Sequence, residues 1–286
     1  METQLRIAVQ KSGRLSEDSL KLFKECGIKF INSTKKLKSV SHNFPVEFLF
    51  LRDDDIPGYV EDGVADLGIV GENVSEEKKK DIHLVKRLGF SRCRLSLAIP
   101  REIDYPGLSY FQGKSIATSY PAILGDYLKA NNIESDIQEI SGSVEIAPGI
   151  GLADGICDIV SSGSTLISNG LKEVEKIYKS EAVLIGNQNL SDEKKTILDQ
   201  LIFRIDAVLS GKSNKYVLLN APNDSIETIV SLLPGMRSPT VLPLATEGWS
   251  SIHSVINEDE FWGKIEELRA AGAEGVLVVP IEKMIV

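Results

Sequence analysis

The sequence predicts an α/β protein in two parts, on two observations. Along residues 1–210, short apolar runs such as residues 67–70 alternate with segments whose apolar side chains recur at helical spacing. This alternation is typical of α/β layers. From residue 212 to 286 the order strand, helix, strand, strand, helix, strand predicts a ferredoxin-like βαββαβ unit. A chain of 286 residues is long enough for two or three domains, each with its own core.

The elements of residues 1–210 are predicted from local signals. Pro121 is placed at a helix start, where its missing N–H costs little, and Gly27 is placed as a helix stop. Apolar runs bounded by polar residues predict strands. The predicted strands are residues 6–10, 47–51, 67–70, 95–99, 115–117, 137–140, 159–160 and 183–185. The predicted helices are residues 16–26, residues 56–62, a helix from Pro121, and residues 192–209.

A second set of elements follows a predicted linker at residues 211–214, which reads Gly-Lys-Ser-Asn. The residues of this set form no recognisable catalytic group. Without a family resemblance, they predict a module that binds a small ligand or mediates oligomerisation. Its predicted strands are residues 216–220, 240–244, 250–256 and 275–279, and its predicted helices are residues 225–233 and 259–271.

Bulk properties exclude several classes. The net charge of −9 argues against a general nucleic-acid surface, which is usually basic. The sequence shows no signal peptide, and no apolar stretch approaches the ~20 residues that span a bilayer, so no membrane association is expected. Three cysteines without metal-ligand spacing suggest reduced thiols, and we expect a cytoplasmic protein.

The most informative segment is residues 145–166, which combines acidic residues with a loop of small hydroxyl residues. Residues 161–165 read Ser-Ser-Gly-Ser-Thr and offer N–H groups and hydroxyls with little bulk. A helix that starts near Ser164 favours a phosphate at this loop. Asp154 and Asp158 share a face if the segment is helical, and also converge on a bent loop. The bland alternatives are an N-cap with its turn, and a solvated pair of aspartates.

The same segment fits the pattern E-x5-G-x-A-x2-I-x-D-I-x2-S-G-x-T-L at every fixed position. This pattern resembles the signature of ATP phosphoribosyltransferase, the enzyme that opens histidine biosynthesis. The resemblance extends over essentially the whole chain. It includes R-I-A-V-Q-K-S-G-R-L, L-R-D-D-D-I-P-G, D-L-G-I-V-G-E-N-V, C-R-L-S-L-A, I-A-T-S-Y-P, L-L-P-G-M-R-S-P-T-V-L-P-L-A and P-I-E-K-M. The last two segments make the chain similar to the long form of the family.

The resemblance implies two α/β lobes like those of periplasmic binding proteins, followed by a regulatory domain. Catalytic lobe I is then residues 1–93 with 190–210, catalytic lobe II is residues 94–189, and the regulatory domain is residues 212–286. One departure is the brief, lysine-rich segment of residues 75–84, where some long forms carry a longer excursion. We expect it to affect only a surface loop.

The implied reaction joins N1 of the ATP adenine to C1′ of 5-phosphoribosyl 1-pyrophosphate, with Mg²⁺ as cofactor and pyrophosphate as leaving group. The resemblance implies catalytic roles for Arg14, Glu145 and Asp154, and a metal site at Glu145 and Asp154. It implies a binding site for phosphoribosyl pyrophosphate at Asp154, Asp158, Ser161, Ser162, Gly163, Ser164 and Thr165.

The resemblance also implies ATP-binding residues, which fall mostly at predicted strand ends. Bland alternatives remain: a β-to-α turn with exposed cations around Lys11, a structural salt bridge for Arg52, and interlobe packing for Tyr120. The ATP-binding residues are Lys11, Gly13, Arg14, Arg52, Gly71, Glu72 and Tyr120.

Likeness to the family's regulatory domain implies feedback inhibition by histidine in a homo-oligomer, a dimer or a hexamer. Alternatively, Ser238 and Thr240 only shape the turn around Pro239. The implied histidine-binding residues are Asn220, Met236, Ser238, Thr240 and Gly275.

A second function from another class is a non-catalytic, intracellular two-lobed sensor with an amino-acid-binding tail. The acidic and hydroxyl residues of 145–166 discriminate against it, because a solute receptor does not need them together.

Overall fold

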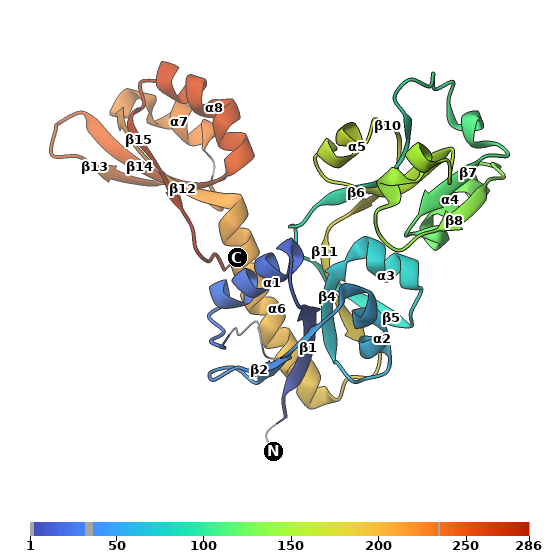
Figure 1. The fold of residues 1–286 in the computed structure, drawn as a ribbon. Coiled ribbons are helices and arrows are strands. Elements are labelled where there is room, and N and C mark those ends of the chain that lie inside the picture. Colours follow the sequence, from blue (N-terminus) through green and yellow to red (C-terminus); the bar gives the residue numbers. More distant parts are fainter. Residues whose placement is uncertain (1–2, 32–36, 234, 286) are drawn as a thin grey trace. The chain divides into compact units, whose positions relative to one another are not determined.

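The computed structural model describes residues 3–31, 37–233 and 235–285, which form two compact units (Figure 1). The first unit comprises residues 1–24 and 28–198, and the second comprises residues 25–27 and 199–286. Within the described ranges, no helix combines the length and the apolar character needed to cross a membrane.

The first unit contains two lobes, each built on its own sheet. The strands of lobe I are β1 (Leu5–Gln10), β2 (Lys38–Val40), β3 (Val46–Leu51), β4 (Leu67–Gly71), β5 (Ile82–Arg87) and β11 (Ala182–Asn187). Its helices are α1 (Arg14–Glu25), α2 (Ile56–Glu61) and α3 (Glu72–Lys78), with a 3-10 turn η1 (Asp53–Asp55) before α2. The strand order is β2-β3-β1-β4-β11-β5. β1, β3 and β4 are parallel, so their carboxyl ends share one edge of the sheet.

The central strands of the mixed sheet of lobe I are continuous apolar runs, a pattern typical of strands that are buried on both faces. Every residue of β11 is buried, and Ala8 and Val70 are fully buried in the same core. α2 packs closely on β4, since a Cβ at Gly68 would lie 2.5 Å from the side chain of Ile56. This packing holds α2 against β4, one of the strands that lead to the candidate site.

Lobe II is a five-stranded sheet with the order β10-β6-β9-β7-β8. β7 is parallel to β8 and β9, whereas β6 is antiparallel to β9 and β10. Its strands are β6 (Cys93–Pro100), β7 (Ser115–Thr118), β8 (Asp136–Glu139), β9 (Gly155–Val160) and β10 (Leu171–Ser180). Its helices are α4 (Pro121–Ala130) and α5 (Ser164–Ser168), with 3-10 turns η2 (Leu108–Phe111), η3 (Val144–Ile146) and η4 (Pro148–Ile150).

The chain crosses between the lobes twice, from β5 to β6 and from β10 to β11. The two-lobed α/β architecture expected from the resemblance is therefore confirmed. The predicted end of lobe II at residue 189 is wrong, because β11 pairs with β4 and β5 in the sheet of lobe I. The return to lobe I occurs near residue 181.

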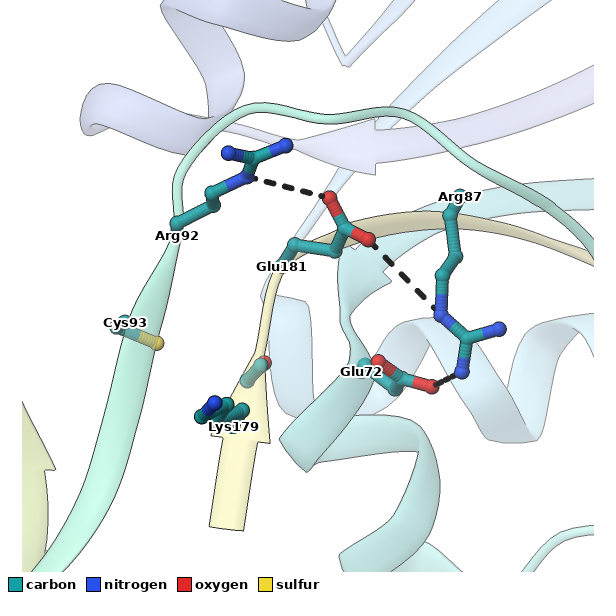
Figure 2. Close-up of a pocket in the computed structure, with 7 residues that line it drawn as sticks. Glu72, Arg87, Arg92, Cys93, Lys179 and Glu181 are labelled. Atoms are coloured by element: carbon teal, nitrogen blue, oxygen red, sulfur yellow. Dashed lines mark hydrogen bonds and ion pairs between the residues drawn. The ribbon is translucent and has the colours of Figure 1, made fainter. Parts of the chain in front are cut away.

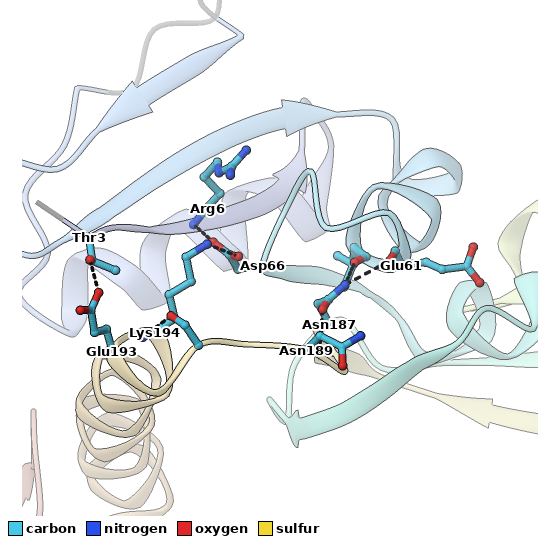
Figure 3. Close-up of polar contacts among 10 residues, drawn as sticks. Thr3, Arg6, Glu61, Asp66, Asn187, Asn189, Glu193 and Lys194 are labelled. Carbon is cyan, nitrogen blue, oxygen red and sulfur yellow. Dashed lines mark hydrogen bonds and ion pairs between the residues drawn. The ribbon is translucent and has the colours of Figure 1, made fainter. Parts of the chain in front are cut away.

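Buried polar contacts hold the amino-terminal edge of the lobe I sheet to the helix α6 (Asp192–Ser213) (Figure 3). The carboxylate of Asp66 is 4% exposed and accepts hydrogen bonds from the Arg6 N–H at 2.8 Å and from Lys194 Nζ at 2.6 Å. Asn187 Nδ2 donates to the Val60 carbonyl at 2.7 Å, which satisfies the end of α2. These contacts lie at the edge opposite to the strand ends described below.

The second unit has the chain order β12, α7, β13, β14, α8, β15, so the predicted βαββαβ unit is confirmed. All four strands are antiparallel, in the order β13-β14-β12-β15. Asn257 caps α8 by accepting the Asp259 N–H at 3.0 Å. The elements are β12 (Asn214–Pro222), η5 (Asn223–Ser225), α7 (Ile226–Leu232), β13 (Thr240–Pro243), β14 (Trp249–Asn257), α8 (Glu258–Ala270) and β15 (Glu274–Pro280).

The predicted linker at residues 211–214 is wrong. α6 continues to Ser213 and β12 begins at Asn214, so no connecting segment separates them. Gly211 is small for a packing reason, since a Cβ there would lie 2.8 Å from the Ile281 carbonyl oxygen. The chain division falls at residue 199 rather than 211, so most of α6 groups with the C-terminal unit.

Candidate functional site

The predicted site residues follow strands whose carboxyl ends meet at the edges of two sheets. In lobe I, β3, β1 and β4 are neighbours, so the segments after them lie next to each other. In lobe II, β7 and β9 are parallel neighbours, which places residues 119–120 beside residues 161–165. Open α/β sheets bind ligands at such edges. The structure thus brings together most of the predicted residues of each lobe.

Three exposed cations lie at the edge of lobe I. Lys11 and Arg14 follow β1, and Arg52 follows β3. Gly13 has φ +95°, a conformation that favours glycine and lets the chain turn from β1 directly into α1. Arg14 lies 77% exposed at the first position of α1, with its Nε 3.8 Å from the Asp18 carboxylate. Exposed cations on short loops suit the charge of a polyphosphate.

Glu72 has a structural partner that the sequence analysis, which predicts ATP binding, does not indicate. Its carboxylate forms an ion pair with Arg87 and is largely shielded from solvent (Figure 2). Arg87 and Arg92 also lie 3.9 Å and 3.7 Å from the carboxylate of Glu181. These groups line a cavity of about 440 Å³ where the chain crosses between the lobes. The position of Glu72 is therefore explained by the crossing strands rather than by a ligand.

The hydroxyl loop of residues 161–165 has the predicted geometry. Gly163 has φ +83° and α5 begins at Ser164, as the sequence predicts. The hydroxyls of Ser162 and Ser164 lie 3.0 Å apart, which indicates a compact loop with small side chains. An added Cβ at Gly163 would meet only Val160, at an ordinary 3.9 Å, so the protein itself leaves space above the loop.

Arg94 supports the hydroxyl loop, a role that no local sequence signal indicates. Arg94 Nη1 donates to the Ser161 carbonyl at 3.0 Å. The other guanidinium nitrogens hold Glu173 through two hydrogen bonds of 2.5 Å and 2.6 Å, and Ser96 Oγ adds a third at 2.8 Å. Arg94 and Glu173 are 79 residues apart, so only the pairing of β6 with β10 brings them together.

Carboxylates from both lobes lie near enough to Tyr120 to influence its pKa. Burial, with smaller contributions from Asp158, Asp53 and Asp54, raises the pKa of Tyr120, so its hydroxyl stays protonated at neutral pH. Burial and the nearby carboxylate of Glu145 raise the pKa of Asp158. Tyr120, Asp158 and Glu145 therefore lie in one acidic region next to the hydroxyl loop. Tyr120 also packs on the core of lobe II, which agrees with the packing alternative.

Asp154 lies away from this region, and the structure does not support its predicted catalytic, substrate-binding and metal-ligating roles. It stands just before β9, whereas Asp158 lies within β9 and the hydroxyl loop follows it. At about 3.3 Å per strand residue, roughly 20 Å separate the two ends of this strand. Asp154 accepts hydrogen bonds from the Ser115 N–H at 2.9 Å and Oγ at 3.1 Å, and pairs with Lys114 Nζ at 3.3 Å.

We expect Asp154→Asn to change stability rather than substrate binding. The Ser115 N–H and the Lys114 ammonium lower the pKa of Asp154. A carboxyl whose pKa is lowered by folding stabilises the protein above its unfolded pKa of about 3.9, and this contribution is lost as the pH falls through the folded pKa. Denaturant unfolding should therefore show a less stable variant at pH 7 and a gap that narrows below about pH 4. A variant with unchanged stability and weakened binding of phosphoribosyl pyrophosphate would return Asp154 to the site.

The described residues do not form a metal site by themselves. Across residues 3–31, 37–233 and 235–285, no group of three or more His, Cys, Asp or Glu side chains is placed to hold a metal ion. The predicted pair of Glu145 and Asp154 has different neighbours, since Glu145 on η3 lies near Asp158, whereas Asp154 precedes β9 and contacts Ser115 and Lys114.

The predicted histidine-binding residues fall into two groups on the C-terminal sheet, one on β12 and β15 and the other at β13. Asn220 on β12 pairs with Glu274, next to Gly275 on β15. Thr240 begins β13 at the other edge, and Met236 and Ser238 precede it. Two strand spacings of about 4.8 Å separate β13 from the strand of Asn220, and three separate it from the strand of Gly275, or roughly 10 Å and 14 Å.

Strand ends on both lobes thus supply groups suited to phosphate, cations on lobe I and a glycine-centred hydroxyl loop on lobe II. Together with the fold, they define a class: two-lobed α/β proteins that act on phosphorylated substrates. Comparison with known proteins identifies the family. The model described as "ATP phosphoribosyltransferase" matches residues 52–207, and "HisG, C-terminal domain" matches residues 211–283. The chain belongs to the ATP phosphoribosyltransferase family.

Relatives align over the whole chain, which confirms the long form. The ATP phosphoribosyltransferase of Cytophaga hutchinsonii is 62% identical over 285 residues, covering 100% of both chains. That of Phocaeicola vulgatus is 63% identical over 281 residues, or 98% of this chain and 99% of the relative. A solved chain of the ATP phosphoribosyl transferase (HisG:HisZ) complex from Thermotoga maritima is 27% identical, with a TM-score of 0.60, covering 71% of this chain and 98% of that one. Family membership favours the enzyme over the ligand-binding sensor.

Proposed function

We propose that this protein transfers the 5-phosphoribosyl group of phosphoribosyl pyrophosphate to N1 of ATP and releases pyrophosphate, in the first step of histidine biosynthesis. The observation that carries the proposal is the placement of residues 145–166. The hydroxyl loop and Asp158 of this signature lie towards the carboxyl ends of the parallel strands of lobe II, where open α/β sheets bind ligands. The chain around them is 62% identical to a named ATP phosphoribosyltransferase.

The reaction is a displacement at an anomeric carbon with an oxocarbenium-like transition state. Its leaving group carries several negative charges, so positioning and charge neutralisation matter more than a strong base. In the proposed site, the N–H groups and hydroxyls of residues 161–165 hold the 5′-phosphate. Asp158 and Glu145 accept hydrogen bonds from the ribose hydroxyls. Arg14 and Lys11 neutralise the polyphosphates, and Tyr120 contacts the adenine ring.

Mg²⁺ is proposed to enter with the substrate. Pyrophosphate oxygens are good ligands for this hard cation, which lowers the charge that the leaving group carries away. The acidic region beside Tyr120 includes Asp53 and Asp158, whose pKa values are both raised by burial. Buried carboxylates are costly when they are ionised and unpaired. A substrate that carries its own Mg²⁺ into this acidic region would offset that cost.

Inhibition by histidine is proposed for the C-terminal unit in a homo-oligomer. The two groups of predicted residues lie roughly 10 to 14 Å apart across the sheet. We propose a dimer or hexamer in which the ligand lies at a subunit contact.

A direct assay tests the proposed reaction. The full-length protein, mixed with ATP, phosphoribosyl pyrophosphate and Mg²⁺, should produce a new near-ultraviolet absorbance as the adenine is modified at N1, together with one pyrophosphate per product. Omission of either substrate, or addition of a chelator, should abolish both signals. Pyrophosphate release without the absorbance change would indicate hydrolysis instead, and a folded protein that gives neither signal would refute the proposal.

A further inference from the structure

Helix α3 of lobe I holds the start of helix α4 of lobe II (Figure 1). The carboxylate of Glu77 accepts hydrogen bonds from the backbone N–H groups of Ala122 at 2.8 Å and Ile123 at 3.0 Å, one on each oxygen. Glu77 lies in the lysine-rich segment of residues 75–84, which the sequence predicts as a surface loop. The structure instead makes it the end of α3 and a contact between lobes.

The amino terminus of α4 has no local cap, which explains why a distant carboxylate fills this role. Tyr120 occupies the N-cap position without a side-chain hydrogen bond to the helix, and Pro121 has no N–H. Ala122 and Ile123 therefore carry the first free amide groups. A carboxylate at this position satisfies them and interacts favourably with the helix dipole.

Two lysines beside Glu77 add contacts in the same region. Lys79 Nζ lies 2.7 Å from Asp126 on α4, and Lys78 Nζ lies 3.5 Å from Asp54 on η1. Both lysine–carboxylate pairs are more than a third exposed on each side, so each contributes little to stability. The pair of Lys79 with Asp126 joins the end of α3 to α4. The pair of Lys78 with Asp54 joins it to η1, next to the acidic region around Tyr120.

We propose that Glu77 is a positioning residue for ATP binding. Glu77 holds the start of α4, a helix of lobe II, against lobe I. It thereby fixes the position of Tyr120, the residue that immediately precedes α4. Asp53 and Asp54 of lobe I already influence the hydroxyl of Tyr120, so a shift of α4 changes this shared region directly. The proposal rests on the proposed contact of Tyr120 with adenine. The hydroxyl loop is supported by Arg94 rather than by Glu77.

The test compares Glu77→Ala and Glu77→Gln with Glu76→Ala, a control at an exposed neighbour on the same helix. A charge-assisted hydrogen bond to a helix terminus is strong enough that its loss should raise the dissociation constant and KM for ATP by roughly tenfold or more. Binding of phosphoribosyl pyrophosphate, measured by calorimetry, should stay within about twofold, because Arg94 rather than Glu77 supports the hydroxyl loop. Glu77→Gln retains one acceptor oxygen and should fall between the unmodified protein and Glu77→Ala.

Hydrogen exchange gives a readout that does not depend on activity. The amides of residues 122–123 should exchange faster in Glu77→Ala than in Glu76→Ala, while thermal unfolding shows both variants folded. Faster exchange without a change in ATP binding would confine Glu77 to capping and overturn the positioning role. Equal behaviour of both alanine variants in every measurement would also overturn it. If the unmodified protein forms no product, the proposed reaction fails, whereas ATP binding and exchange still decide the role of Glu77.

Discussion

A Gly163→Val variant is expected to bind phosphoribosyl pyrophosphate more than about tenfold more weakly than the unmodified protein, because a β-branched side chain fills the space the 5′-phosphate needs. The structure leaves this space open, since an added Cβ at Gly163 meets only Val160, at 3.9 Å. The loss should therefore come from the ligand rather than from a clash within lobe II. Calorimetry with phosphoribosyl pyrophosphate measures the loss, and thermal unfolding checks the fold.

Backbone strain needs its own control, because Gly163 has φ +83° and valine in this region costs about 1–2 kcal/mol. Gly142→Val provides the match, since Gly142 lies in the same lobe with φ +82° and open space around an added Cβ. Both variants should lose similar stability, but only Gly163→Val should lose affinity. Equal affinity in the two folded variants would remove the phosphate from residues 161–165.

A Gly275→Val variant is expected to keep its basal activity in millimolar histidine, where the unmodified protein is inhibited. Coupling between a regulatory and a catalytic site typically amounts to about 1–3 kcal/mol, or roughly a 5- to 150-fold change in affinity. An added Cβ at Gly275 would lie 3.5 Å from Asn220 Nδ2, so valine crowds the space beside this amide. The measurements are activity and sedimentation, each with and without histidine.

The matched control is Gly248→Val in the same domain. Gly248 has φ +82° and no heavy atom within 4 Å of an added Cβ, so it reports the backbone cost alone. This control should remain sensitive to histidine. An unmodified protein whose activity and sedimentation both ignore millimolar histidine would leave the C-terminal unit as an assembly module. Inhibition of Gly275→Val to the same extent as Gly248→Val would move the histidine site elsewhere.

Much of the candidate site was predictable because it depends on short segments. A run of small hydroxyl residues around Gly163 encodes its own turn, and Gly13 does the same after β1. The spacing of Asp154 and Asp158 was not enough, because the sequence did not fix the local conformation. Two residues that are four positions apart lie close together on a helix, but they are about 13 Å apart on a strand such as β9.

The contacts that join distant segments were beyond prediction from one sequence. Arg94 supports the hydroxyl loop and holds Glu173 only because β6 pairs with both β9 and β10. Glu77 reaches the start of α4 across 45 residues of sequence. No local property of either side chain distinguishes it from an ordinary exposed charge, so these roles arise from the fold.

The sequence by itself determined the elements whose side chains are buried and whose ends carry turn residues. The apolar runs of β3 and β11 and the βαββαβ order of the C-terminal unit are of this kind, because burial imposes a pattern that can be read locally. Only the tertiary structure decided β5, which is short and ends in two cations, and β10, whose charges recur along its whole length. These strands form because β11 and β6 supply their hydrogen-bond partners, and that pairing also sets the boundary between the lobes.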